Sequence, residues 1–194
     1  MAKSFHAHRF VFAMCGVTLV ELMVTIAVAA ILLAVAVPGF RNLIVSNRLT
    51  ATTNAFVAAL NLARIEAIKR NARVTLCKTA DPNATEPNCA ASASWNQGAI
   101  VFVDRGTVGT VESGDILLRV LGPFPDVTIT TGDRFALGVS YLPTGVSKGI
   151  PAAGSTTELG NDDDDTFTFC VSGQGRKIEI NATGRPASKS PDSC

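Results

Sequence analysis

Few side chains in this sequence have the chemistry that hydrolases and transferases use. The chain has two histidines, His6 and His8, and both precede the first long apolar segment. Serine can pair with lysine instead, but Ser172, Ser188 and Lys189 show no spacing that favours such a pair. Because most general-base and triad mechanisms depend on an imidazole, the sequence predicts a protein that is not an enzyme and has no catalytic residues.

Metal and cofactor sites are not predicted either. The acidic run Asp162–Asp165 offers the oxygen ligands that calcium prefers, but the distal glutamate of an EF-hand loop is missing. No C-x-x-C occurs among the cysteines, which argues against structural zinc. We therefore expect Gly149–Asp165 to be a solvated, mobile loop, and we expect no cofactor.

Glu21 is the one charged residue in the apolar segment Val17–Val37. At about 1.5 Å per residue, a helix of this length spans roughly 30 Å, the thickness of a bilayer's hydrocarbon core. Secretory signal peptides have shorter apolar regions, of about 7 to 15 residues. Lys3 and Arg9 precede the segment without an acidic residue, which favours a cytoplasmic N-terminus. The sequence therefore predicts a single membrane span with the following domain outside the cytoplasm.

A carboxylate in hydrocarbon costs a few kcal/mol, so Glu21 needs an explanation. Ionisable residues within membrane segments are functional by default. The alternative is a tolerated charge near a helix end that reaches the membrane interface.

The elements after this segment change in pattern. Apolar residues at spacings of three and four predict that the helix continues to about Ala72, with a bend or local melting at Pro38 and Gly39. The expected core stripe is Phe40, Leu43, Ile44, Ala51, Ala55, Ala59, Leu62, Ala63 and Ile68.

Alternating apolar runs separated by glycine, proline and asparagine then predict strands. The expected strands are 73–78, 99–104, 116–121, 134–142, 166–172 and 177–181. The last two form a hairpin through GQGR, and alternation points Ile100 and Phe102 toward the core.

The N-terminal region combines a short basic leader, Gly16, the stretch VTLVEL and an apolar helix with Pro38 near its end. In these features it resembles type IV pilins and the pseudopilins of type II secretion. The resemblance implies that prepilin peptidase cleaves after Gly16 and that the new amine of Val17 is methylated. Glu21 then becomes the fifth residue, and its carboxylate pairs with the amine of a neighbouring subunit in the filament. Val17 stands where the family usually has phenylalanine.

Four downstream stretches follow in the order ALNLARIEAIKRNARVTLC, WNQGAIVFVD, TFTFC and INATGRP. They narrow the resemblance to the GspH/FimT family of minor pilins and pseudopilins. The resemblance implies an α+β, type IV pilin-like fold, with a long N-terminal helix packed on an antiparallel β-sheet domain. The implied parts are a leader at 1–16, a transmembrane part at 17–37, an amphipathic continuation at 38–72 and a globular β-rich domain at 73–194.

Loss of the leader removes Cys15 and leaves Cys77, Cys89, Cys170 and Cys194. An even set in an oxidising compartment favours disulfides. Local pairing would join Cys77 to Cys89 and Cys170 to Cys194, although the sequence allows three connectivities.

The C-terminal tail gathers four cations, Arg176, Lys177, Arg185 and Lys189. Some FimT-type relatives bind DNA through a glycine-arginine-x-arginine motif here. Gly184 and Arg185 match that motif, but Ala187 replaces the second arginine. Two or three cations give only weak, salt-sensitive phosphate binding, so a solvated surface tail is the alternative.

The resemblance therefore implies a minor pilin or pseudopilin that helps to initiate or cap a filament. Its expected partners are other pilins, prepilin peptidase and the bacterial inner membrane, with the C-terminal domain in the periplasm. The alternative function is a DNA-binding minor pilin of an uptake pilus. Type IV pilus and type II secretion membership are not separated by one sequence.

Overall fold

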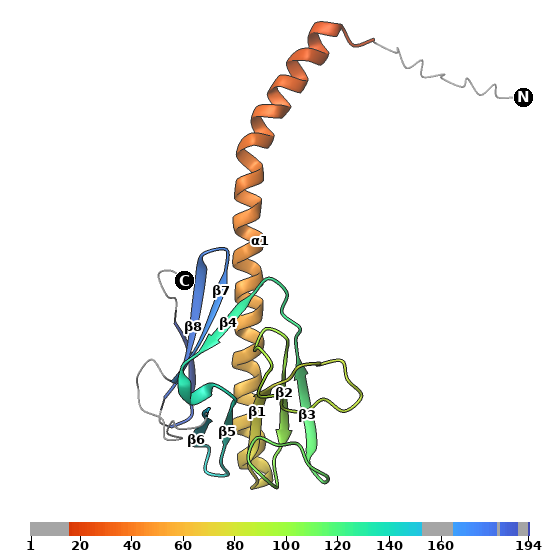
Figure 1. Ribbon diagram of the computed structural model, residues 1–194. Coiled ribbons are helices and arrows are strands. Elements are labelled where there is room, and N and C mark those ends of the chain that lie inside the picture. Colours follow the sequence, from red (N-terminus) through yellow and green to blue (C-terminus); the bar gives the residue numbers. More distant parts are fainter. Residues whose placement is uncertain (1–15, 153–164, 182, 190–193) are drawn as a thin grey trace, which may run out of the picture. The chain divides into compact units, whose positions relative to one another are not determined.

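The computed structural model describes residues 16–152, 165–181, 183–189 and 194 (Figure 1). The chain groups into two compact units, residues 1–42 and 43–194. The predicted leader lies outside the described residues apart from Gly16, and so do Asp162–Asp164.

One long helix, α1, runs from Leu19 to Arg70. It begins with a capping pattern, because the Glu21 backbone N–H donates to Thr18 Oγ1 at 3.2 Å. At its end Asn71 has φ 49°, and the N–H of Ala72 donates to Ala67 O. Asn71 N–H donates to Ile68 O, which completes a Schellman-type ending. Both ends of the helix are therefore encoded locally.

Two antiparallel sheets and the second half of α1 build the domain. The five-stranded sheet has the order β3-β2-β1-β5-β6, and the four-stranded sheet has the order β4-β7-β8-β9. The strands of the first sheet are β1 Val74–Lys78, β2 Ala99–Val103, β3 Ile116–Leu121, β5 Gly138–Tyr141 and β6 Ser147–Ile150. The second sheet contains β4 Thr128–Thr131, β7 Thr166–Val171, β8 Gln174–Ile180 and β9 Pro186–Lys189. A 3-10 turn, η1 Asp133–Phe135, precedes β5.

The main core lies between α1 and both sheets. Phe56 of α1 is completely buried, and its ring centroid lies 5.0 Å from Phe169 and 5.8 Å from Phe167, both on β7. Trp95 and Phe124 pack on the same ring at 6.1 and 5.3 Å. Aromatic pairs at these separations add to the burial of their surface, so Phe56 joins the helix to the strands.

The predicted α+β architecture is confirmed, and the strands expected at 73–78, 99–104 and 116–121 are β1, β2 and β3. The strand expected over 134–142 is wrong in its first half, where η1 turns the chain before β5 begins. Three strands were not predicted: β4, β6 and β9. Their sequences, TITT, SKGI and PASK, are short and polar, so their hydrophobic period is too weak to mark them.

Two details of the strands also differ. The hairpin of β7 and β8 turns at Ser172 and Gly173, both with positive φ, so only the first glycine of the predicted GQGR connection lies in the turn and the rest belongs to β8. Ile100 and Phe102 are buried, but they form a second cluster with Cys77 on the sheet face away from the main core, while Val101 and Val103 face the core. Both faces of β2 are covered, so alternation alone does not predict which of its residues face the main core.

The expected helical stripe is wrong in part. Ala59 and Ala63 are buried, but Phe40, Leu43 and Ile68 are exposed. The buried face consists of Leu49, Thr52, Thr53, Phe56, Ala59, Leu60, Ala63 and Ala67. The helix also continues through Pro38 and Gly39, so the predicted local melting is not observed.

The loop expected over 149–165 is wrong at both of its ends, and residues 153–164 lie outside the described residues. Gly149 and Ile150 belong to β6, and Asp165 is buried with its carboxylate 3.2 Å from the Arg134 guanidinium. Asp165 is therefore a structural anchor for the start of β7.

Candidate functional site

The first candidate site is the start of α1. Gly16 has no atom within 4 Å of the position a Cβ would take, and Val17 is 68% exposed. Glu21 is also exposed, and its backbone N–H is capped by Thr18. Among the described residues, the predicted cleavage site and the Glu21 carboxylate are therefore both accessible.

The part of α1 after Glu21 is covered by large aliphatic side chains that are exposed. By length and composition, the helix contains a segment that is able to cross a membrane, and none of that segment is buried. A contiguous exposed apolar surface along a helix of this length is typical of an interaction site or a membrane segment.

The four cations of the tail do not form one cluster. In the register of β8 and β9, Lys177 lies opposite Lys189 and Glu179 lies opposite Ala187. Paired positions share a sheet face, so Lys177 and Lys189 lie on one face. Arg176 pairs with the buried Phe169 and belongs to the opposite face. The sequence did not separate Arg176 from the other three.

Arg185, two residues before Ala187, lines the same hollow as Lys189 and so lies on the face of Lys177 and Lys189. An acidic residue lies among these three cations. Glu179 forms an ion pair with Lys189. A shallow hollow of about 360 Å³ is lined by Glu179, Asn181, Arg185, Ala187 and Lys189. Glu179 reduces the positive charge of this hollow.

The Arg185 turn is held by residues that the sequence analysis did not single out. Asn181 Oδ1 accepts from the N–H groups of Thr183 and Arg185 at 3.2 and 2.9 Å. Arg64 of α1 donates to Gly145 O at 3.1 Å and to Thr183 O at 3.2 Å. The stretch INATGR holds the signal, because an asparagine and a glycine within a few residues of each other are typical of turns. Hydrogen bonds therefore stabilise the turn internally and also join it to α1.

Gly184 of this turn is buried and has φ 80°. A Cβ there would lie 2.5 Å from Gly145 O and 3.2 Å from Tyr141 Cε1. Gly184 is thus required for close packing as well as for the backbone conformation.

Burial raises the pKa of Tyr141 well above its usual value, and the nearby Arg64 lowers it by a smaller amount.

Both pairs of cysteines predicted from local spacing are bonded. The structure joins Cys77 to Cys89, with Cα atoms 5.6 Å apart, and Cys170 to Cys194, with Cα atoms 5.9 Å apart. Within the described residues no group of three or more histidine, cysteine or acidic side chains is arranged to hold a metal ion.

The features above suit more than one class of protein, and comparison with known proteins identifies the family. The family described as Type II transport protein GspH matches residues 52–184, which is more than half of the chain. The chain belongs to the GspH family.

Members of this family are structural subunits, so the chain has the role of a minor pilin or pseudopilin, and its partners include other pilins. Two crystal structures of the Pseudomonas aeruginosa type IV minor pilin FimU are also similar. The first is 20% identical, covers 77% of this chain and 96% of its own, and has a TM-score of 0.48. The second is 20% identical with 75% and 99% coverage and a TM-score of 0.46. Among curated proteins there is no match.

Proposed function

We propose that this chain is a non-enzymatic subunit that enters a type IV pilus or type II secretion pseudopilus and helps to initiate or cap its assembly. One observation carries the proposal. Glu21 is the one charge in an exposed apolar helical stretch that is long enough to cross a bilayer. An isolated protein gains nothing from such a stretch, whereas a membrane or a bundle of sister helices covers it.

The order of events follows from the same residues. The stretch holds the chain in the bacterial inner membrane with the C-terminal domain in the periplasm. Prepilin peptidase cleaves between Gly16 and Val17, and the new amine is methylated. The amine of one subunit then neutralises Glu21 of a neighbour, which sets the axial register of the filament.

Processing is tested by mass spectrometry of the N-terminus from cells that contain the peptidase. We expect a chain that begins with methylated Val17, and we expect Gly16→Glu to keep its leader. A wild-type chain with an intact leader in those cells would refute the processing step.

The role of Glu21 has a competing explanation in the structure. A glutamate three residues after Thr18 is the pattern of a capping box, in which glutamine serves as well as glutamate. Glu21→Gln therefore separates the two roles. If the charge sets register, Gln and Ala should both reduce incorporation into sheared filaments, while Asp should retain part of it. Full incorporation of the Gln variant would assign Glu21 to helix capping instead.

The second candidate function is DNA binding at the hollow formed by Arg185 and Lys189. The shared face of Lys177, Arg185 and Lys189 favours it, and the ion pair between Lys189 and Glu179 opposes it. An arginine at position 187 would lie directly opposite Glu179 and would pair with it. We therefore expect Ala187→Arg alone to add little affinity for double-stranded DNA, and Ala187→Arg with Glu179→Gln to add more.

The DNA test uses the full chain in detergent and a salt series. Bound phosphates should make the logarithm of the affinity fall linearly with the logarithm of salt concentration, with a slope of about −0.9 per phosphate contact. Arg185→Gln should weaken binding without unfolding the domain. If the wild type, Ala187→Arg and Ala187→Arg with Glu179→Gln all fail to bind DNA at low salt, the DNA function is excluded. The proposal of filament assembly would still stand.

A further inference from the structure

The second half of α1 is exposed along one narrow face. Between Ile44 and Ile68 the exposed positions follow one another at alternating steps of three and four, with Arg48 as the one addition. Each kind of position therefore recurs every seven residues, which is the spacing with which one α-helix packs along another. We call this surface the asparagine face, and it consists of Ile44, Asn47, Ala51, Asn54, Ala58, Asn61, Ile65 and Ile68.

The chemistry of the asparagine face does not suit contact with water. None of its side chains is charged, whereas the outer faces of surface helices normally carry charged and polar residues. Ile44 and Ile65 are 58% and 60% exposed. Among the described residues, the side chains of Asn47, Asn54 and Asn61 make no hydrogen bond. Asparagine is a poorer helix former than lysine or glutamate, so these residues weaken the helix of an isolated subunit without a compensating contact.

The domain leaves the asparagine face open. Leu49, Phe56 and Ala63 also recur every seven residues, and they are buried against the sheets on another side of the helix. Ala51 and Ala58 have small side chains, so the backbone of a second helix can approach closely. An asparagine in a seam between two helices is buried, and its amide needs a partner across that seam. This face therefore fits a helix that has amide or hydroxyl side chains at the matching positions.

The charges beside the asparagine face distinguish between possible helices. Arg48 and Lys69 lie on one flank and Arg64 lies on the other, at the positions that meet across a coiled coil. Arg48 and Lys69 also form ion pairs with Asp126 and Glu66, but exposed pairs of this kind contribute little. A second copy of this chain, packed in parallel, would place Lys69 beside Arg64 of the partner subunit. Charge complementarity therefore favours a different chain, with acidic flanks, over a second copy.

We propose that the asparagine face packs in parallel against the N-terminal helix of a different pilin, and that Asn47, Asn54 and Asn61 select this partner by pairing with its amide or hydroxyl groups. A helix with aliphatic residues at those positions is rejected, because it would leave the buried amides unpaired. The inference rests on the proposed filament function, because a filament brings the helices of neighbouring subunits together. Its test needs no filament, so the two proposals can fail separately.

The test measures binding of designed helical peptides to the full chain in detergent, by fluorescence anisotropy. Each peptide has isoleucine at one seam position of the heptad, asparagine or leucine at the other, and glutamate or lysine on both flanks. With glutamate flanks, we expect the asparagine peptide to bind about tenfold more tightly than the leucine peptide, which corresponds to about 1.4 kcal/mol. Lysine flanks should weaken binding, and this difference should shrink as salt is added.

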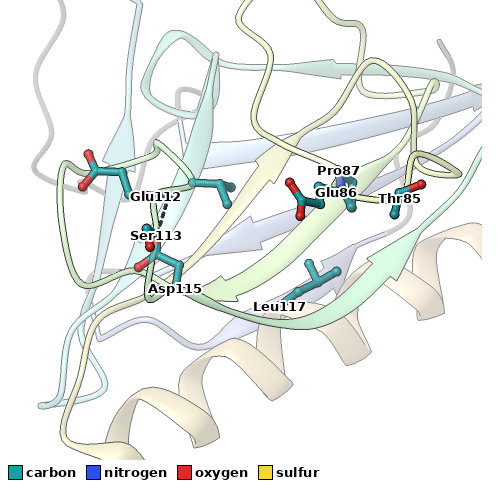
Figure 2. A pocket seen from close by; sticks show the side chains of 8 residues that line it. Thr85, Glu86, Pro87, Glu112, Ser113, Asp115 and Leu117 are labelled. Atoms are coloured by element: carbon teal, nitrogen blue, oxygen red, sulfur yellow. Dashed lines mark hydrogen bonds between the residues drawn. The ribbon is translucent and has the colours of Figure 1, made fainter.

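The control variants use a separate surface of the domain. A cavity of about 530 Å³ lies between the β1–β2 loop, the β2–β3 loop and β3. Figure 2 shows Thr85 on one side of it and Ser113 on the other, with Leu117 between them. This surface has exposed positions but no helical repeat. Thr85→Leu with Ser113→Leu therefore adds two leucines at exposed positions without changing the asparagine face.

The matched variant on α1 is Asn54→Leu with Asn61→Leu. It should reverse the preference, so that the leucine peptide binds more tightly than the asparagine peptide. Thr85→Leu with Ser113→Leu should keep the preference of the wild type. Absence of binding by all of the peptides, equal binding of the asparagine and leucine peptides to the wild type, or an unchanged preference in the α1 variant would overturn the proposal.

Discussion

The two halves of α1 have the same secondary structure and opposite surroundings. Residues 19–42 carry large aliphatic side chains that are exposed, such as Leu32 at 65%. Residues 43–70 bury a stripe that alternates bulky Leu49, Phe56 and Leu60 with the small Ala59 and Ala63. Small residues allow strands to approach a helix closely, and large ones fill the space between. An apolar sequence alone therefore does not make a helix part of the core. The sizes of its side chains must also fit the surface of the strands that pack on it.

The largest expected difference between the halves is in stability. Phe56→Ala removes a ring that contacts four other aromatic rings, so we expect a loss of about 3 to 5 kcal/mol in the free energy of unfolding. Leu32→Ala is the matched change in the first half and should leave that free energy unchanged. Denaturant unfolding followed by the fluorescence of Trp95, the one tryptophan, measures both. Equal losses would show that the first half also belongs to the folded core.

A smaller loss of stability is expected from substitutions that probe how the second half of α1 holds the Arg185 turn. Gly184→Ala adds a Cβ 2.5 Å from Gly145 O at φ 80°, whereas Gly173→Ala meets the same φ with no atom within 4 Å. We expect the Gly173 variant to lose about 1 kcal/mol from backbone strain alone. The Gly184 variant should lose clearly more and should shift the resonances of Arg64. Equal losses would mean that the turn packs less closely than the structure shows.

The smallest effect concerns pH. Tyr141, the one tyrosine, has its pKa raised by burial, so the folded state favours the neutral phenol. The stability this provides is complete below the unfolded pKa of about 10 and is lost as pH rises above it. Absorbance of the phenolate should therefore stay low in the folded protein at pH 10 and should appear at the normal pKa in denaturant. Normal titration in the folded protein would show that Tyr141 is accessible to water.

Sequence patterns predicted the family, the long helix and the strands β1, β2 and β3, because these elements have strong periods or specific motifs. They did not predict β9, whose proline and polar residues are typical of a loop and which forms only because β8 offers an edge. They also misplaced the helical stripe, since both Ile68 and Leu60 suit a helical face and only the sheets decide which is buried. At the tail, cross-strand register brought Glu179 beside Lys189, which linear spacing does not reveal.

The central claim is that the exposed half of α1 is covered by other pilins in a filament. A photo-reactive amino acid at Leu32 tests this in cells, with Ile65 as a control at a similarly exposed position, 60%, in the second half. We predict that Leu32 forms adducts with other pilins, and that these adducts disappear in the Gly16→Glu and Glu21→Ala backgrounds, whereas any adducts at Ile65 identify surfaces of the domain. Pilin adducts at Leu32 that persist unchanged in both backgrounds, or no pilin adducts at Leu32 in cells that assemble filaments, would contradict the account.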